Sequence, residues 1–286
     1  MNQERLNRRA RSLRWPAVAA FALIGAVACG PPPPPPTPTT TTMVTTTTTP
    51  STTTTSTIST TSTTSTTSTT IPGCGTPTAI NTGFPLSTPT PGWYTADTRT
   101  NGTVSVNSTY GGAPGFNCNS AQLTTGANSP LNSAGQFPDK AQLFSYAQAG
   151  TALSNINNIS YWSYRSSVPT PNPAVDLALN VKIIGGGATA FLVYEPYNQS
   201  GGSGAIVDNT WQNWDATATT PGDGVWWSSG IPSGPGSQGS PQPWSFFQTT
   251  YAGDTIDGYG FNLGSNNPNT DVAGDGLIFG ATTTDF

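Results

Sequence analysis

Closely spaced aromatic pairs carry the clearest chemical potential in this chain. The pairs are Tyr161 with Trp162, Trp211 with Trp214, and Trp226 with Trp227. On a β-strand, side chains at an odd spacing point to opposite faces, so only one member of each pair can enter a core. An outward ring can stack on the C–H face of a pyranose while neighbouring polar side chains bind its hydroxyl groups. We predict a ligand surface among these six residues and Asp215; the alternative is that loops cover the outward rings as a second, minor core.

Catalytic chemistry has little support in the residue types. The chain has no histidine, which excludes imidazole-based triads and His-ligated zinc. Glycoside hydrolysis needs two carboxylates, but Glu195 is the sole glutamate after residue 4, and no motif selects Asp176 or Asp215 as its partner. Because Glu195 precedes Pro196, we expect a solvated strand end or a structural hydrogen bond there. We predict no catalytic residue, although an enzyme is not excluded.

Four aspartates late in the chain lie among glycines. They are Asp254, Asp257, Asp271 and Asp275. Oxygen-rich loops of this kind suit Ca²⁺, which accepts irregular sets of carboxylate and carbonyl ligands. The spacing matches no EF-hand, so the expectation is either a structural calcium site or a set of solvated turn residues. No other cofactor is expected.

The N-terminus has the order of a secretory signal. Residues 1–14 are cationic and residues 15–28 are apolar, a run too short for the ~20 residues of a membrane-spanning helix. It ends Ala26-Val27-Ala28-Cys29-Gly30, which resembles the lipobox of bacterial lipoproteins, and this implies that Cys29 is lipidated. An ordinary signal cut after Ala28, or an uncleaved anchor, is the alternative. We expect export to the outer face of the cytoplasmic membrane or the cell surface, with secretion as the alternative.

A low-complexity segment, residues 29–73, follows the signal. Six prolines run from Pro31 to Pro36, and 29 of the 34 residues in 37–70 are Ser or Thr. Without apolar periodicity, nothing repays the entropy of ordering. We predict a disordered, extended stalk. Its Ser- and Thr-rich composition is typical of O-glycosylated segments.

Cys74 and Cys118 are the remaining cysteines. In an exported protein, two such thiols most economically form one disulfide, which would tie the end of the stalk to the folded domain.

The charge of the predicted domain excludes one class of partner. From residue 75 onward, four basic residues stand against twelve acidic ones, a net charge of −8. Nucleic-acid binding requires clustered Lys and Arg, so no nucleic-acid partner is predicted.

Residues 74–286 show many short runs of alternating hydrophobicity. The clearest is 174–183, in which Val175, Leu179 and Ile183 share one face while Asp176 and Lys182 share the other. About ten such runs, separated by Gly, Pro, Asn and Ser, predict an all-β, two-sheet antiparallel β-sandwich of the jelly-roll type. The spacing of Trp244, Phe247 and Tyr251 predicts one short helix within 243–251.

A resemblance extends this interpretation. The order of the segments 159–165, 173–183, 192–197, 210–215 and 225–227 is similar to that of secreted, mostly uncharacterised actinobacterial β-sandwich proteins of the carbohydrate-binding-module type. The resemblance implies a jelly roll and export. Together with the aromatic pairs, it predicts non-catalytic binding of a polysaccharide or cell-wall glycan, with contact to a membrane only through the N-terminal signal or lipid. A structural or adhesive surface protein that recognises another protein is the alternative, and a glycan-active hydrolase or lyase is a third reading.

Overall fold

The computed structural model describes residues 76–83, 91–127, 130–167, 174–186, 188–201 and 204–286. These residues all lie in one compact unit, Thr66–Phe286. The predicted signal peptide and stalk, with Cys29 and Cys74, lie outside the described residues. No helix in the described part of the chain has the length and apolarity needed to cross a membrane.

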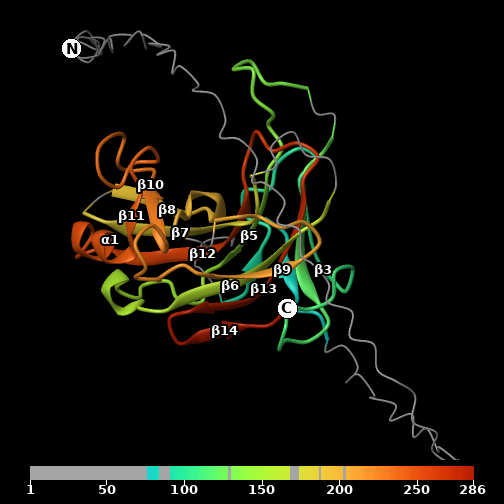
Figure 1. Ribbon diagram of the computed structural model, residues 1–286, viewed down its shortest axis with the longest axis horizontal. Coiled ribbons are helices and arrows are strands. Elements are labelled where there is room, and N and C mark those ends of the chain that lie inside the picture. The colour runs from blue at the N-terminus through green and yellow to red at the C-terminus, as the bar shows by residue number, and fades with distance from the viewer. Residues whose placement is uncertain (1–75, 84–90, 128–129, 168–173, 187, 202–203) are drawn as a thin grey trace, which may run out of the picture. The chain divides into compact units, whose positions relative to one another are not determined.

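The described strands form two sheets that lie one over the other (Figure 1). In spatial order, the eight-stranded sheet contains β1 (Ile80–Asn81), β2 (Trp93–Tyr94), β5 (Ala141–Ser145), β12 (Thr255–Leu263), β7 (Ala178–Gly185), β8 (Ala188–Tyr194), β10 (Val225–Ser228) and β11 (Gln242–Pro243). The six-stranded sheet contains β3 (Thr103–Asn107), β4 (Ser120–Thr124), β13 (Asp271–Phe279), β6 (Ile159–Arg165) and β9 (Trp211–Asp215), with β14 (Thr282–Thr284) paired to β13. Apart from the short β1–β2 pair, the described strand pairs are antiparallel.

The strand order is that of a jelly roll. Four adjacent strands of one sheet have the order β4-β13-β6-β9, and four adjacent strands of the other have the order β5-β12-β7-β8. The chain passes from β4 to β5, from β6 to β7 and from β12 to β13 by crossing between the sheets, so each sheet alternates early and late strands. The prediction of an all-β, two-sheet antiparallel sandwich is confirmed.

Period-2 alternation decides which side chains fill the core. Leu179, Val181 and Ile183 of β7 are fully buried between the sheets, whereas Lys182 is outward and forms an ion pair with Asp257 of β12 at 2.6 Å. Gly274 of β13 allows the sheets to approach closely, because a Cβ there would lie 2.6 Å from the ring of Phe261.

The single helix in the described residues is α1 (Trp244–Thr250), within the predicted range 243–251. Trp244 and Phe247 are buried on its inner face. The ring centroids of Trp244 and Trp226 lie 4.8 Å apart. Two 3₁₀ turns, η1 (Leu153–Asn155) and η2 (Pro196–Asn198), complete the described elements.

Cys118 precedes β4 and is disulfide-bonded. Its predicted partner, Cys74, lies outside the described residues, so the pairing of these two cysteines stays a prediction.

Candidate functional site

The structure separates the aromatic pairs into inward and outward rings. Tyr161, Trp214 and Trp226 are at most 1% exposed. Their polar atoms are also satisfied internally: for example, Trp226 Nε1 donates to the carbonyl oxygen of Ala216 at 2.7 Å. The prediction that these three residues contact a ligand is therefore wrong, because they form part of the core. Trp162, Trp211 and Trp227 are half-buried on outer faces.

Two of the outward tryptophans share the outer face of the six-stranded sheet with Asp215. There Trp211 packs against Tyr164, which stacks on Tyr110 with ring centroids 4.6 Å apart. Trp211 Nε1 also donates to the Tyr110 carbonyl oxygen at 3.3 Å, so these rings fasten the 108–117 loop to the sheet. Asp215 is exposed, but its Oδ1 accepts hydrogen bonds from the backbone and side chain of Thr217. This side of the sheet matches the alternative of a minor core under a loop.

The four aspartates considered for calcium do not come together. Asp257 belongs to β12 and pairs with Lys182, whereas Asp271 and Asp275 belong to β13 in the other sheet. Asp275 is fully buried and accepts three backbone N–H bonds, from Ala113, Gly276 and Phe286. No group of three or more metal-ligating side chains occurs among the described residues. The calcium prediction for Asp254, Asp257, Asp271 and Asp275 is therefore wrong, since Asp257 belongs to the eight-stranded sheet whereas Asp271 and Asp275 belong to the six-stranded sheet.

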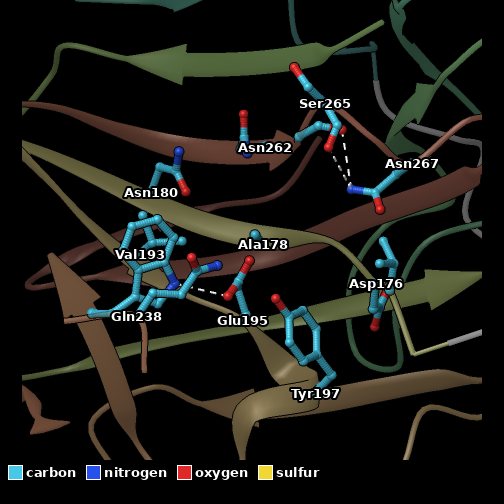
Figure 2. Close-up of a pocket in the computed structure, with 13 residues that line it drawn as sticks. Asp176, Ala178, Asn180, Val193, Glu195, Tyr197, Gln238, Asn262, Ser265 and Asn267 are labelled. Atoms are coloured by element: carbon cyan, nitrogen blue, oxygen red, sulfur yellow. Dashed lines mark hydrogen bonds between the residues drawn. The ribbon is translucent and has the colours of Figure 1, made fainter. Parts of the chain in front are cut away.

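A pocket lies on the outer side of the eight-stranded sheet (Figure 2). Trp227 is one of the residues that line it. The cavity measures about 310 Å³, at the lower end of the range for small-molecule sites. Strands β7, β8, β10 and β12 form its floor, and loops before β7, after β8, after β10 and after β12 form its rim. Its lining consists of Val175, Asp176, Ala178, Asn180, Val193, Glu195, Tyr197, Trp227, Gln238, Asn262, Gly264, Ser265 and Asn267.

One wall of the pocket is held by a ladder of polar bonds from the inner face of β6. Tyr161 Oη donates to the Leu177 carbonyl oxygen at 2.6 Å, Ser163 Oγ donates to Asp176 Oδ2, and Arg165 Nη1 donates to the Val175 carbonyl oxygen at 3.1 Å. Successive inward residues of β6 thus bind successive residues of the segment 175–177. The ladder explains why polar residues occupy inward positions in the sequence of β6.

Asp176 has a structural role in this wall, because its carboxylate is bonded to other groups of the protein. Its carboxylate accepts the Ser163 hydroxyl at Oδ2 and the Leu177 N–H at Oδ1, at 2.7 Å. Burial raises the pKa of Asp176 to about 6, against the opposing effects of these two hydrogen bonds. The group is 4% exposed. Both oxygens are therefore engaged by the protein itself.

Glu195 is the carboxylate that lies within the pocket. Its Oε2 accepts from Trp227 Nε1 at 2.8 Å and from Asn198 Nδ2 at 3.0 Å. Figure 2 shows Tyr197 and Gln238 beside it. Burial, and then the negative charge of Glu195, raise the pKa of the Tyr197 hydroxyl well above its usual value. The expectation of a structural hydrogen bond at Glu195 is correct, but the bond orients the ring of Trp227 at the pocket.

Amide side chains complete the site, and sequence reasoning missed them. Asn180 of β7 and Asn262 of β12 lie on the floor, 6% and 9% exposed. Gln142 of β5 donates to Asn262 Oδ1 at 3.4 Å, whereas Asn180 Oδ1 is buried without a hydrogen-bond partner. The single available signal was the polar face of 174–183, where Asn180 stands among Asp176 and Lys182.

A second cavity, of about 330 Å³, lies where α1 meets the segment 217–219. Its one aromatic lining residue, Trp244, is 4% exposed. The amide nitrogen of Gln248 is already bonded to surrounding oxygens, including the Ile156 carbonyl at 3.1 Å. This cavity therefore offers a ligand little ring surface.

Comparison with protein-family models, with curated proteins and with solved structures found no match.

Proposed function

We propose that this chain is a non-catalytic recognition protein that binds a glycan in the pocket on the outer face of the eight-stranded sheet. The observation that carries the proposal is the half-exposed Trp227 in the lining of a pocket that also contains Tyr197, Glu195 and several amides. Flat rings bind the C–H faces of sugars, and amide and carboxylate groups bind their hydroxyls.

The carboxylates of the pocket support binding over hydrolysis. Hydrolysis of a glycosidic bond requires a carboxylic acid and a second carboxylate on either side of that bond. Asp176 and Glu195 are the carboxylates of the lining, and both oxygens of Asp176 are bonded to Ser163 and Leu177. Among the described lining residues, no second reactive carboxylate is left to act with Glu195.

The N-terminal region determines where the proposed binding domain is located. We propose that the signal peptide 1–28 directs export, that Cys29 is the lipid anchor, and that the stalk 29–73 presents the domain at the cell surface. The carbohydrate-binding resemblance of the β-sandwich agrees with such a placement, because a tethered binding domain needs reach as well as a ligand.

The proposal is tested by binding to a panel of plant, fungal and bacterial polysaccharides. The wild-type chain is expected to bind at least one of them. Trp227→Ala is expected to weaken that binding at least tenfold, which corresponds to about 1.4 kcal/mol of binding free energy. Trp211→Ala is the matched control, since it removes a half-buried tryptophan from the other sheet, and it should bind like the wild type. Absence of binding to every polysaccharide would contradict glycan recognition and would favour an adhesive role toward a protein.

A further inference from the structure

The lining of the pocket carries charge of one sign. Its ionisable acids are Asp176 and Glu195, and the described lining residues include no Lys or Arg. A carboxylate, sulfate or phosphate on a ligand would enter next to Glu195 without a compensating cation. In a partly desolvated site, two like charges repel more strongly than they do in water.

Glu195 retains capacity for a ligand donor. An ionised carboxylate has about four acceptor positions, and Trp227 and Asn198 occupy two of them on Oε2. Tyr197 is the other neighbouring donor. A hydroxyl group of a ligand can therefore still donate to Glu195, whereas an anionic group has no proton to give.

Asn180 provides an independent pointer to a ligand. Its side chain lies on the pocket floor beside Val193, its partner in the strand register of β7 and β8 (Figure 2). Its Oδ1 is buried and lacks a hydrogen-bond partner, a state that costs free energy until a donor arrives. Because this oxygen is covered, a ligand donor can reach it only if a neighbouring lining side chain shifts.

We infer that the pocket selects an uncharged glycan, whose hydroxyl groups donate hydrogen bonds to Asn180 and Glu195, and that it rejects glycans carrying acidic groups. The inference rests on the proposed function, which it deepens by naming the class of sugar. The acceptor groups of the pocket bind the hydroxyl donors of the sugar. The negative charge of Glu195, which no lining cation neutralises, disfavours acidic glycans relative to neutral ones.

The experiment compares each neutral polysaccharide that binds with the same polymer oxidised to the carboxylate at C6. The full chain is expected to bind the oxidised polymer at least tenfold more weakly. Glu195→Gln keeps an acceptor at this position and removes the charge, so it should recover most of that lost affinity. Equal binding of both polymers by the wild type, or preference for the oxidised one, would overturn the inference while leaving glycan recognition in place.

Asn180→Leu tests the role of the amide. Leucine is similar in size and lacks the unpaired acceptor, so the melting temperature should hold or rise while affinity for the neutral polymer falls about tenfold. Asn213→Leu, on the outer face of the other sheet, is the matched control and should leave affinity unchanged. Unchanged affinity in Asn180→Leu would overturn the assignment of Asn180. If no polysaccharide of either kind binds, the proposed function itself fails.

Discussion

Asp176 should make the domain less stable at neutral pH than in mild acid. Burial raises the pKa of its carboxyl group from 3.8 to about 6, although the Ser163 and Leu177 hydrogen bonds and the nearby Arg165 act in the opposite direction. The folded state therefore holds this proton more tightly than the unfolded chain does. The resulting stabilisation is fully present below pH 3.8 and is lost as the pH rises through about 6.

The magnitude follows from the size of this shift. Each pKa unit corresponds to about 1.4 kcal/mol, so a shift of roughly two units makes the ionised group cost up to about 3 kcal/mol at pH 7. Asp176→Asn resembles the protonated side chain and cannot ionise. We expect this variant to exceed the wild type in unfolding free energy by up to about 3 kcal/mol at pH 7, and by only about 0.6 kcal/mol at pH 4.

The assay is urea unfolding, followed by tryptophan fluorescence, at a series of pH values from 4 to 8. The difference between variant and wild type is the required quantity, because burial also raises the pKa of Asp275 to about 6 and both proteins share that effect. Asp215→Asn removes an exposed carboxylate and serves as the control, with an expected difference within about 0.5 kcal/mol at every pH. If Asp176→Asn is the less stable protein at pH 7, then the Ser163–Asp176 bond outweighs the cost of burial and the reasoning fails.

Replacement of the two adjacent tryptophans should destabilise the domain to different extents. Trp226→Ala is expected to lower the unfolding free energy by about 3–5 kcal/mol in chemical unfolding, because it empties a fully buried site, and Trp227→Ala should lower it much less. Equal losses would contradict the inward and outward assignment. Reduction of a Cys74–Cys118 disulfide should lower the thermal midpoint by several degrees, and labelling of either thiol in the native protein would disprove the pairing. Cys29→Ser should release soluble protein, or leave an uncleaved precursor, with the β-sandwich unchanged; a processed variant that stays on the membrane would rule out the lipid anchor.

Alternating hydrophobicity predicted the strands wherever one face of a strand is apolar. The run 174–183 overlaps β7 from Ala178 onward, and the segment 159–165 coincides with β6. The helix was also predictable, because the aromatic residues in 243–251 follow a helical spacing. By contrast, β4 has the sequence SAQLT, whose inward side holds Ala121 and Leu123, and two apolar residues are too short a pattern to predict a strand.

The candidate site was less accessible from the sequence because tertiary structure assembles it. Parity along a strand requires Trp226 and Trp227 to face opposite ways, but it does not say which one enters the core. The bond between Trp227 and Glu195 joins residues 32 positions apart, one within β10 and the other directly after β8. Asn180 gave no distinct signal, because polar residues are common at outward positions of a strand. The sequence does not show that loops cover this face of the sheet.

The most direct test of glycan binding at Trp227 is a titration that observes the indole N–H signals by nuclear magnetic resonance. A neutral oligosaccharide from the polymer that binds should shift the Trp227 signal, since its N–H is bonded to Glu195 in the pocket. The buried indoles of Trp214, Trp226 and Trp244, each bonded inside the core, should stay in place. Shifts at Trp162 or Trp211 with an unmoved Trp227 signal would place the ligand on the other sheet and contradict the account.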